Sequence, residues 1–426
     1  MPKLGKPQAP YKRLCSEVLL HNAWQVIYQN GLRSTSNKTR ESVRIFKERE
    51  RQNISRIYRA ILNRKFKFEG VHGVAIGDKK RPIALSSVEG RVVQRAILDV
   101  LQDQAGITKY LNAPGSYGAL KSEYDSKKGV RPAIEAAVRA IEMGADSFFQ
   151  SDIKSFFTSI PRPEVIKTIG KSVDDTEFLD ILEKATNLEV QNIDRIPKDQ
   201  RQFFDYTTVG TPQGCCLSPL IGNILLYDFD VQMNGSGVTC LRYLDDFIIL
   251  GKGWKAVHDA SERAIQILSG LGLSAYNLNE LNTKAVSGQI ANGFDFLGVE
   301  VFGQNIRPNK KSRLRLLETV QDMMTETFKQ NFEDIQSREQ RDHSLIATLY
   351  AIDNKIRGWG NQYSFCNEGA IWGNVDEEIN KIIKGYLGRY GSLREAMESK
   401  KARRRLLGVH LVSESKSDPI MWSSQK

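Results

Sequence analysis

The chain has 426 residues, of which 40% are hydrophobic and 26% are charged, and its formal net charge is +11. This composition is typical of a globular protein and excludes wholesale disorder, while the length predicts two or three subdomains rather than one core. The positive charge favours a polyanionic partner, nucleic acid ahead of an anionic membrane. Because there is no apolar run of 18 or more residues and no signal-peptide core at the start, we expect a cytoplasmic protein that does not engage a membrane.

Cysteine and histidine usage restricts the metals that the chain could hold. The five cysteines form no CxxC pair, and the five histidines show no HxxxH spacing. This pattern predicts free thiols rather than a disulfide framework, a structural zinc site or a histidine-bound metal. A catalytic metal would then be held by carboxylates, which favours Mg²⁺ or Mn²⁺.

Helix and strand patterns alternate through the first two thirds of the chain. A short helix is expected at 18–27, and residues 36–64 are predicted to form one basic amphipathic helix. The apolar face of this helix would carry Ile45, Ile54, Ile57, Ile61 and Leu62. Its polar face leans positive, which leaves open whether it contacts phosphate groups or only solvent.

Further along the chain, the pattern predicts strands that are separated by helices. Residues 70–85 predict two short strands around a Gly-Asp-Lys-Lys turn, and Pro132 favours the start of a helix. The other expected elements are a helix at 88–101, a strand at 146–153, two helices within 163–186, a Gly/Pro loop leading into an apolar helix at 210–230, a strand–turn–strand unit at 237–250, a helix at 256–271 and short strands to 301. Helices over a mainly antiparallel sheet indicate an α+β fold.

Two acidic segments stand out because each follows an apolar run. Asp245 and Asp246 lie in the sequence YLDD, between CLR and FIIL, and Asp152 ends the run SFFQSD. Each segment alone has an ordinary interpretation, since Asp favours turns and helix caps. Together, carboxylates from separate strands can hold two divalent ions about 3.5–4 Å apart for phosphoryl transfer. That chemistry requires oxygen ligands on a basic protein, and this chain offers both.

The order of these motifs resembles that of reverse transcriptases, and most closely the bacterial group II intron-like lineage. The palm motifs of that family are matched by DIKSFF (152–157), GTPQGCCLSPLIGNILL (210–226) and YLDD (243–246). Further matching blocks are RPIALSSVEGRVVQRAIL in the fingers, GSYGALKSEYDSKKGVRPAI before the first palm aspartate, NLNELNTKAV with the later palm lysine, GFDFLGVEV as the primer-grip hairpin and KIRGWGNQYSF in the thumb. The similarity spans roughly residues 40–365.

The resemblance implies an enzyme, an RNA-directed DNA polymerase, and a role for each matching residue in its palm. Asp152, Asp245 and Asp246 match the metal carboxylates for two Mg²⁺ ions, with Mn²⁺ as a possible substitute, and Ile153 would add its backbone carbonyl. Phe157 matches the position under the nucleotide sugar, where a ring would exclude a 2′-hydroxyl and favour deoxynucleotides. Gln213 and Gly214 match residues that line the incoming nucleotide and the template base, and glycine permits close backbone approach.

Other matches concern phosphate groups and the primer. Arg81 matches the fingers arginine that grips the triphosphate; its companion is Lys79 or Lys80, and the spacing does not decide which. Lys284 matches the lysine proposed to protonate pyrophosphate, although an ordinary surface lysine remains an alternative. Phe296, Leu297 and Gly298 match the primer grip, or form a structural hairpin. Contacts to the nucleic-acid backbone are expected from Arg307, Lys310, Lys311, Arg313 and Arg315, or else these residues only solubilise the surface. A second basic run, 400–405, carries the same two interpretations.

The resemblance also predicts a right-hand polymerase fold, with fingers and palm built from an antiparallel sheet plus helices and a helical thumb. The expected layout is an N-terminal extension at 1–35, mainly fingers at 36–145, palm at 146–305, and a helical thumb with a basic tail at 306–426. A fingers-side helical insertion is expected at about 163–206. The clearest boundary is expected near residue 305, since the sequence beyond Arg307 becomes helical and basic.

Three biological interpretations follow from the sequence. No HNH-type His/Cys cluster is present, and little room follows the thumb motif for a ribonuclease H domain. We therefore favour a reverse transcriptase that copies a partner non-coding RNA in bacterial antiphage defence. The alternatives are a group II intron-encoded maturase that aids splicing and retrohoming, and an inert RNA-binding protein. The expected partners are a structured RNA template, the DNA product strand and deoxynucleoside triphosphates, and the oligomeric state stays open.

Overall fold

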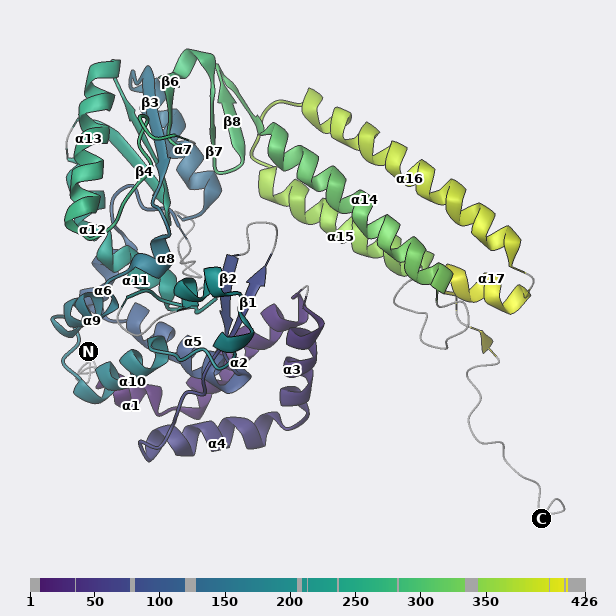
Figure 1. Ribbon diagram of the computed structural model, residues 1–426, viewed down its shortest axis with the longest axis horizontal. Coiled ribbons are helices and arrows are strands. Elements are labelled where there is room, and N and C mark those ends of the chain that lie inside the picture. The colour runs from purple at the N-terminus through teal and green to yellow at the C-terminus, as the bar shows by residue number, and fades with distance from the viewer. Residues whose placement is uncertain are drawn as a thin grey trace, which may run out of the picture. The chain divides into compact units, whose positions relative to one another are not determined.

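A computed structural model describes the chain over residues 8–34, 36–76, 81–118, 128–204, 209–212, 214–235, 237–281, 283–333, 344–397, 399–409 and 411–412. Its contacts divide the chain into unit 1, Met1–Ile290, and unit 2, Ala291–Lys426 (Figure 1). Within the described ranges, no helix is long and apolar enough to cross a membrane. The five cysteines are free thiols, as the sequence predicts.

Unit 1 holds most of the helices and two of the three sheets. Its helices are α1 (Pro10–Leu14), α2 (Glu17–Leu32), α3 (Asn37–Glu48), α4 (Glu50–Leu62), α5 (Val88–Gln102), α6 (Ala105–Leu111), α7 (Val130–Glu142), α8 (Phe156–Ser159), α9 (Arg162–Gly170), α10 (Thr176–Thr186), α11 (Ser218–Leu225), α12 (Tyr227–Asn234) and α13 (Trp254–Gly270). Its strands are β1 (His72–Ile76), β2 (Arg81–Leu85), β3 (Ser147–Asp152), β4 (Thr239–Tyr243), β5 (Asp246–Gly251) and β6 (Val286–Gln289).

The basic segment 36–64 forms two helices, and the prediction of one continuous helix was wrong. The chain breaks at Arg49, which leaves the helical conformation between α3 and α4. The break lets each helix present its own apolar face, since α3 buries Val43 and Phe46 whereas α4 buries Ile54, Ile57 and Ile61. Ile45 and Leu62, predicted to belong to one buried face, are 58% and 49% exposed. Packing of two short faces therefore overrides the single helical period.

The central sheet of unit 1 has the strand order β4-β5-β3-β6, and all its pairings are antiparallel. Strand β5 lies inside the sheet, and Phe247 to Leu250 are buried along it, which accounts for the continuous apolar run. Helices α7 and α13 flank the sheet (Figure 1). The strands predicted at 146–153 and 237–250 are thus confirmed, and they are neighbours in one sheet.

Unit 2 consists of a small sheet and long helices. Its elements are β7 (Phe294–Phe296), β8 (Val299–Phe302), β9 (Asn305–Pro308), α14 (Lys310–Glu333), α15 (Leu345–Tyr363), α16 (Ala370–Ala396) and α17 (Lys400–Leu407). The helices bury a separate core that includes Val320, Met324, Ile352 and Tyr386. The division by contacts falls after Ile290, whereas the sequence favours a boundary near 305. The difference arises because the hairpin of β7 and β8 is anchored to α14 and α15.

Candidate active site

The acidic motif YLDD forms a tight turn between two buried strands. Tyr243 and Asp246 face each other as the last pair of the β4–β5 ladder, so Leu244 and Asp245 are the turn residues. Leu244 has a φ of 61°, the left-handed region that an L-leucine rarely adopts. Strain of this kind is retained where the surrounding structure fixes the backbone, and it often marks a functional turn. The sequence gives no sign of it, because leucine is not a typical left-handed residue.

The third carboxylate reaches the same turn through strand pairing. Asp152 ends β3 and is the register partner of Asp246 on β5. Beyond the ladder, the Ile153 amide donates to the Asp245 carbonyl over 2.9 Å. The end of β3 is therefore joined to the start of β5 by the Asp152–Asp246 pairing and to the turn by the bond from Ile153 to Asp245. The fold brings Asp152, Asp245 and Asp246 to one edge of the sheet; the role of the Ile153 carbonyl as a metal ligand stays a prediction.

The carboxylates strongly affect one another. Burial, together with hydrogen bonding to Asp152 and the charges of Asp152 and Asp245, raises the pKa of Asp246 to about 8. This raised pKa means that Asp246 keeps a proton for part of the time near neutral pH when no cation is bound. Without a cation, the site therefore relieves its repulsion by remaining partly protonated.

This donor set fits a hard divalent cation. Carboxylate oxygens are the ligands that Mg²⁺ and Mn²⁺ prefer, and a cation would replace the proton that the raised pKa keeps on Asp246. Among the described residues, no three His, Cys, Asp or Glu side chains are yet gathered as a metal site requires.

Metal binding at this site should depend on pH. Since the pKa of Asp246 is raised to about 8, a cation must displace a proton below that pH. We expect the affinity for Mn²⁺ to increase about tenfold per pH unit from about pH 6 and to level off above about pH 8. Titration calorimetry in two buffers of different ionisation enthalpy would also detect the released proton. An affinity independent of pH over this range would contradict the prediction.

Lys284 lies at the same edge of the sheet. Its Nζ is 3.2 Å from Asp152 Oδ2, and it lies 4.8 Å from the centre of the Tyr276 ring. Although partial burial opposes the charge, the hydrogen bond to Asp152 raises the pKa of Lys284, so this lysine keeps its proton. The segment before Lys284 is attached to the end of β3 at Tyr276. The Tyr276 amide donates to the Asp152 carbonyl, and the Tyr276 carbonyl accepts from the Ser151 hydroxyl. The contact with Asp152 favours a functional position over an ordinary surface lysine.

Phe157 follows Asp152 on the short helix α8. Its ring is half-buried and lies 5.2 Å from the ring of Phe156, which is itself buried in the core. The Phe157 carbonyl accepts from the Thr211 amide over 2.7 Å. This bond places the segment that leads to Gly214 beside α8, and Gly214, with a φ of 107°, packs against β2. The fold thus brings together two regions that the sequence predicts around the nucleotide.

Four of the expected nucleotide contacts are not placed. Lys79, Lys80 and Gln213 lie outside the described residues. Arg81 begins β2 and is the register partner of Ile76, but its side chain also lies outside what is described. Their roles in binding the triphosphate and the template base therefore stay predictions.

The expected primer grip forms a tight hairpin in unit 2. Phe296 is buried, and Leu297 and Gly298 are the turn residues between β7 and β8, with φ of 52° and 81°. A Cβ at Gly298 would lie 2.7 Å from the Tyr363 hydroxyl, so only glycine fits there. The Gly298 carbonyl accepts from the Asn309 amide and the Ser312 hydroxyl, which fixes the turn on the start of α14. Its contact with a primer stays a prediction.

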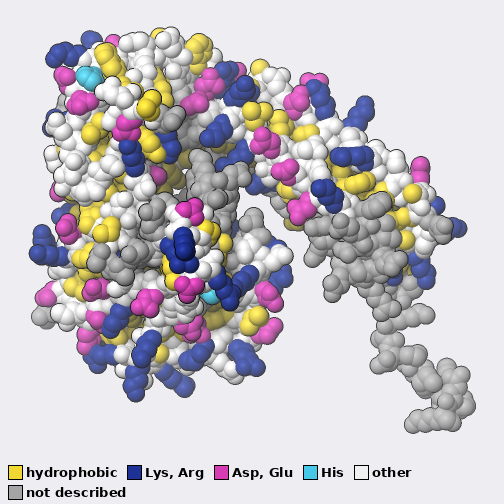
Figure 2. Space-filling view, viewed as in Figure 1, with side chains coloured by type: hydrophobic (Ala, Val, Ile, Leu, Met, Phe, Trp, Pro, Cys, Tyr) yellow, Lys and Arg dark blue, Asp and Glu magenta, His cyan; other side chains and the backbone are white. Residues whose placement is uncertain are grey.

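The basic run of unit 2 divides into two groups. Arg307 is held by ion pairs with Glu300 and Glu368, at 2.8 and 3.1 Å, and these carboxylates raise its pKa. Its guanidinium therefore has a structural role between β8, β9 and the segment before α16. The other predicted backbone contacts are on α14, where Lys310, Lys311 and Arg315 are exposed and Arg313 is half-buried. Figure 2 shows Lys and Arg scattered among Asp and Glu on the face drawn, rather than in one patch.

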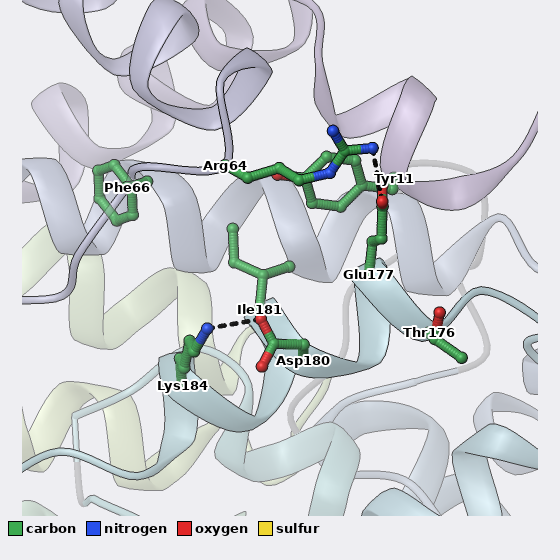
Figure 3. Close-up of a pocket in the computed structure, with 8 residues that line it drawn as sticks. All are labelled: Tyr11, Arg64, Phe66, Thr176, Glu177, Asp180, Ile181 and Lys184. Carbon is green, nitrogen blue, oxygen red and sulfur yellow. Dashed lines mark hydrogen bonds and ion pairs between the residues drawn. The ribbon is translucent and has the colours of Figure 1, made fainter.

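One pocket of the described structure contains none of the predicted site residues. It has a volume of about 230 Å³ and lies between α1, the end of α4 and α10 (Figure 3). Its charged side chains point at one another, since Arg64 pairs with Glu177 and Lys184 with Asp180. Because these charges are paired with each other, this pocket is a poor site for a nucleotide, and the candidate active site is instead at the ends of β3 and β5 in the central sheet.

Sequence reasoning missed an arginine beneath the acidic turn. Arg242, two residues before Leu244, is fully buried and pairs with the buried Asp230 on α12. A signal was present, since each is a charged residue next to apolar ones, Arg242 in CLRYL and Asp230 in FDV. Charges in such runs are rarely buried without a partner, so the two could have been matched to each other.

Comparison with known protein families matches residues 73–301, more than half of the chain, to the family "Reverse transcriptase (RNA-dependent DNA polymerase)". The matched region contains the three aspartates, Lys284 and both sheets of unit 1. The chain therefore belongs to the reverse transcriptase family.

The chain is also similar to individual proteins, one of which is encoded by a group II intron. Protein YkfC of Escherichia coli is 23% identical over 265 residues, which are 52% of this chain and 62% of that protein. The group II intron-encoded protein LtrA of Lactococcus lactis is 23% identical over 224 residues, 52% of this chain and 34% of LtrA. An uncharacterised 91 kDa protein in the cob intron of Schizosaccharomyces pombe is 28% identical over 186 residues, 42% of this chain and 20% of that protein. The chain thus spans about a fifth to three fifths of these relatives.

Comparison with solved structures finds only distant similarity. A Cas6-RT-Cas1–Cas2 complex has 22% identity over 61% of this chain and 42% of that chain, with a TM-score of 0.35. Telomerase from Candida albicans has 13% identity over 81% of this chain and 67% of that chain, with a TM-score of 0.39. The family match and the observed helices and antiparallel sheets confirm the predicted α+β right-hand polymerase fold. The limits of fingers, palm and thumb stay predictions.

Proposed function

We propose that this chain polymerises DNA on an RNA template by joining a primer 3′-hydroxyl to a deoxynucleoside triphosphate at Asp152, Asp245 and Asp246. The observation that carries this proposal is the register pairing of Asp152 with Asp246 beside the strained turn of Asp245. Membership of the reverse transcriptase family supports the same reaction class.

The proposed mechanism assigns separate tasks to the residues at the sheet edge. The three aspartates would hold two Mg²⁺ ions, with Mn²⁺ as a substitute, which activate the attacking hydroxyl and stabilise the leaving oxygen. Lys284 keeps its proton at neutral pH and lies beside Asp152. We assign Lys284 to the leaving pyrophosphate. In this role it would leave Asp152 and contact the pyrophosphate, which it would stabilise by its charge or by donating a proton. Phe157 would exclude ribonucleotides, and Arg81 with Lys79 or Lys80 would hold the triphosphate.

The template and the biological role form a second level of the proposal. We propose a partner non-coding RNA as template, copied in the bacterial cytoplasm as part of antiphage defence. The alternative, a group II intron-encoded protein that aids splicing, is favoured by the relatives encoded within introns. Sequencing the RNA and DNA that copurify with the protein distinguishes the two. A single structured RNA with its complementary DNA supports the first role, and a spliced intron supports the second.

Primer extension tests the reaction itself. Purified protein is given an RNA template, an annealed primer, the four deoxynucleotides and Mg²⁺, and RNA and DNA primers are used in parallel. We expect DNA products that lengthen along the template and are lost when EDTA removes the metal. Self-primed copying of the copurified RNA covers a protein that accepts no added primer. Absence of DNA in all of these reactions would leave an inert RNA-binding protein as the better interpretation.

A further inference from the structure

A fully buried arginine lies directly beneath the acidic turn. Arg242 is on β4, and its side chain has no exposed surface, while that of its partner Asp230 on α12 is 1% exposed. A buried ion pair of this kind is costly to desolvate and contributes little stability relative to an apolar pair. Its presence therefore calls for a task that an apolar side chain would not perform.

The guanidinium connects three surrounding segments. Its Nε and Nη2 donate to the two carboxylate oxygens of Asp230, at 2.7 and 2.5 Å. Nη2 also lies 3.0 Å from the Ser116 hydroxyl and 3.2 Å from Asn223 Oδ1. These contacts come from α12, from the segment before residue 118 and from α11. The planar group is thereby fixed in position and orientation.

The remaining donor is directed at the turn. Arg242 Nη1 donates to the Leu244 carbonyl over 2.9 Å. This carbonyl belongs to the same peptide group as the Asp245 amide, so its direction sets the plane from which the Asp245 side chain departs. On the other side of Asp245, its own carbonyl accepts from the Ile153 amide. The backbone of Asp245 is therefore held on one side by Arg242, through the carbonyl of the strained Leu244, and on the other side by the end of β3.

A third element closes on the turn from outside. The backbone of residues 115–117 pairs in parallel with β4, through bonds of 2.7 and 2.8 Å to the Arg242 amide and carbonyl. A Cβ at Gly118 would lie 2.6 Å from the Leu244 nitrogen, so the turn is enclosed there without spare space. Loss of the Arg242 contact would leave Leu244 free to relax from its left-handed conformation.

We propose that Arg242, clamped by Asp230, is a positioning residue that holds the Leu244–Asp245 peptide so that Asp245 faces Asp152 and Asp246 for metal binding. The inference rests on the proposed function, because it gives these aspartates the role of metal ligands. Lysine is a poor replacement, since one ammonium cannot span a bidentate carboxylate and the Leu244 carbonyl with fixed geometry.

The test compares Arg242→Lys with a matched control, Asn234→Ala. Asn234 joins the same elements, since its amide contacts the carbonyls of Pro114, Asp230 and Cys240, but it does not contact the turn. Four quantities are measured for each full-length protein: the Mn²⁺ dissociation constant by electron paramagnetic resonance, kcat and KM for primer extension, and the melting temperature. Only Mn²⁺ binding that is lost in the double variant Asp245→Ala/Asp246→Ala is assigned to the proposed metal site.

For Arg242→Lys we expect Mn²⁺ to bind about 10- to 100-fold more weakly, the loss typical of residues that orient metal ligands. kcat should fall in the same range, and KM for the deoxynucleotide should change little at saturating metal. Asn234→Ala should lower the melting temperature yet bind Mn²⁺ like the wild type. If Arg242→Lys does not fold, Ser116→Ala removes a single contact of the guanidinium and should weaken Mn²⁺ binding up to about fivefold.

Each outcome separates this inference from the proposed function. If Arg242→Lys and Asn234→Ala lose stability alike and both bind Mn²⁺ like the wild type, Arg242 is only structural and the positioning role is wrong. The same conclusion follows if Arg242→Lys does not fold and Ser116→Ala leaves Mn²⁺ binding unchanged. If Asp245→Ala/Asp246→Ala binds Mn²⁺ and extends primers as well as the wild type, the proposed metal site itself fails.

Discussion

Replacement of both turn aspartates, Asp245→Ala/Asp246→Ala, is expected to reduce primer extension by about a thousandfold or more. The reason is that the double variant leaves only Asp152 to hold the cations, and electrostatic stabilisation by bound metal is the main contribution to phosphoryl transfer. The protein should nevertheless fold, because burial and the neighbouring charges already oppose ionisation of Asp246. We therefore expect a melting temperature no lower than that of the wild type in the absence of metal.

The matched control for this variant is Asp146→Asn. Asp146 precedes the opposite end of β3, where its carboxylate accepts from the Ser147 hydroxyl and the Gly253 amide. The variant Asp146→Asn removes one carboxylate from the residue just before β3 without affecting the acidic turn. Extension by Asp146→Asn should stay within a few-fold of the wild type, and extension by the double variant at the wild-type rate would refute the assignment of the active site.

Replacement of Phe157 by alanine is expected to increase ribonucleotide incorporation by about 10- to 100-fold relative to deoxynucleotides. The backbone bond from the Thr211 amide holds Phe157 in place, so its ring cannot easily move aside for a 2′-hydroxyl. Removing the ring removes the clash, and steric exclusion in a pocket is worth discrimination of this order. The ratio of kcat/KM for a ribonucleotide and its deoxy counterpart measures the effect.

The neighbouring Phe156 supplies the control for the loss of an aromatic side chain. Phe156→Leu alters the core, since this side chain is 2% exposed, but it does not replace the ring assigned to the sugar. It should lower stability and leave the sugar preference unchanged. Equal discrimination by Phe157→Ala and the wild type would remove Phe157 from sugar selection.

Part of the fold was predictable because its signals are local. The strand–turn–strand unit at 237–250 and the helices within 163–186 follow from apolar runs and their periodicity, and both are present. The break at Arg49 was not predictable from period alone, because it depends on two short apolar faces that find separate positions in the core. The shift of the boundary from 305 to Ile290 likewise depends on contacts between the β7–β8 turn and the unit 2 helices.

By itself, the sequence determined the family, the acidic residues and the strands that carry them, because apolar runs interrupted by carboxylates are recorded directly in the chain. Only the tertiary structure decided that Asp152 and Asp246 are register partners, that Leu244 is held in a left-handed conformation, and that Arg242 with Asp230 supports the turn. The physical reason is that pairing between strands and burial of charge arise between segments far apart in the chain. Such contacts set the pKa of Asp246 and the direction of the Asp245 peptide, which no local pattern encodes.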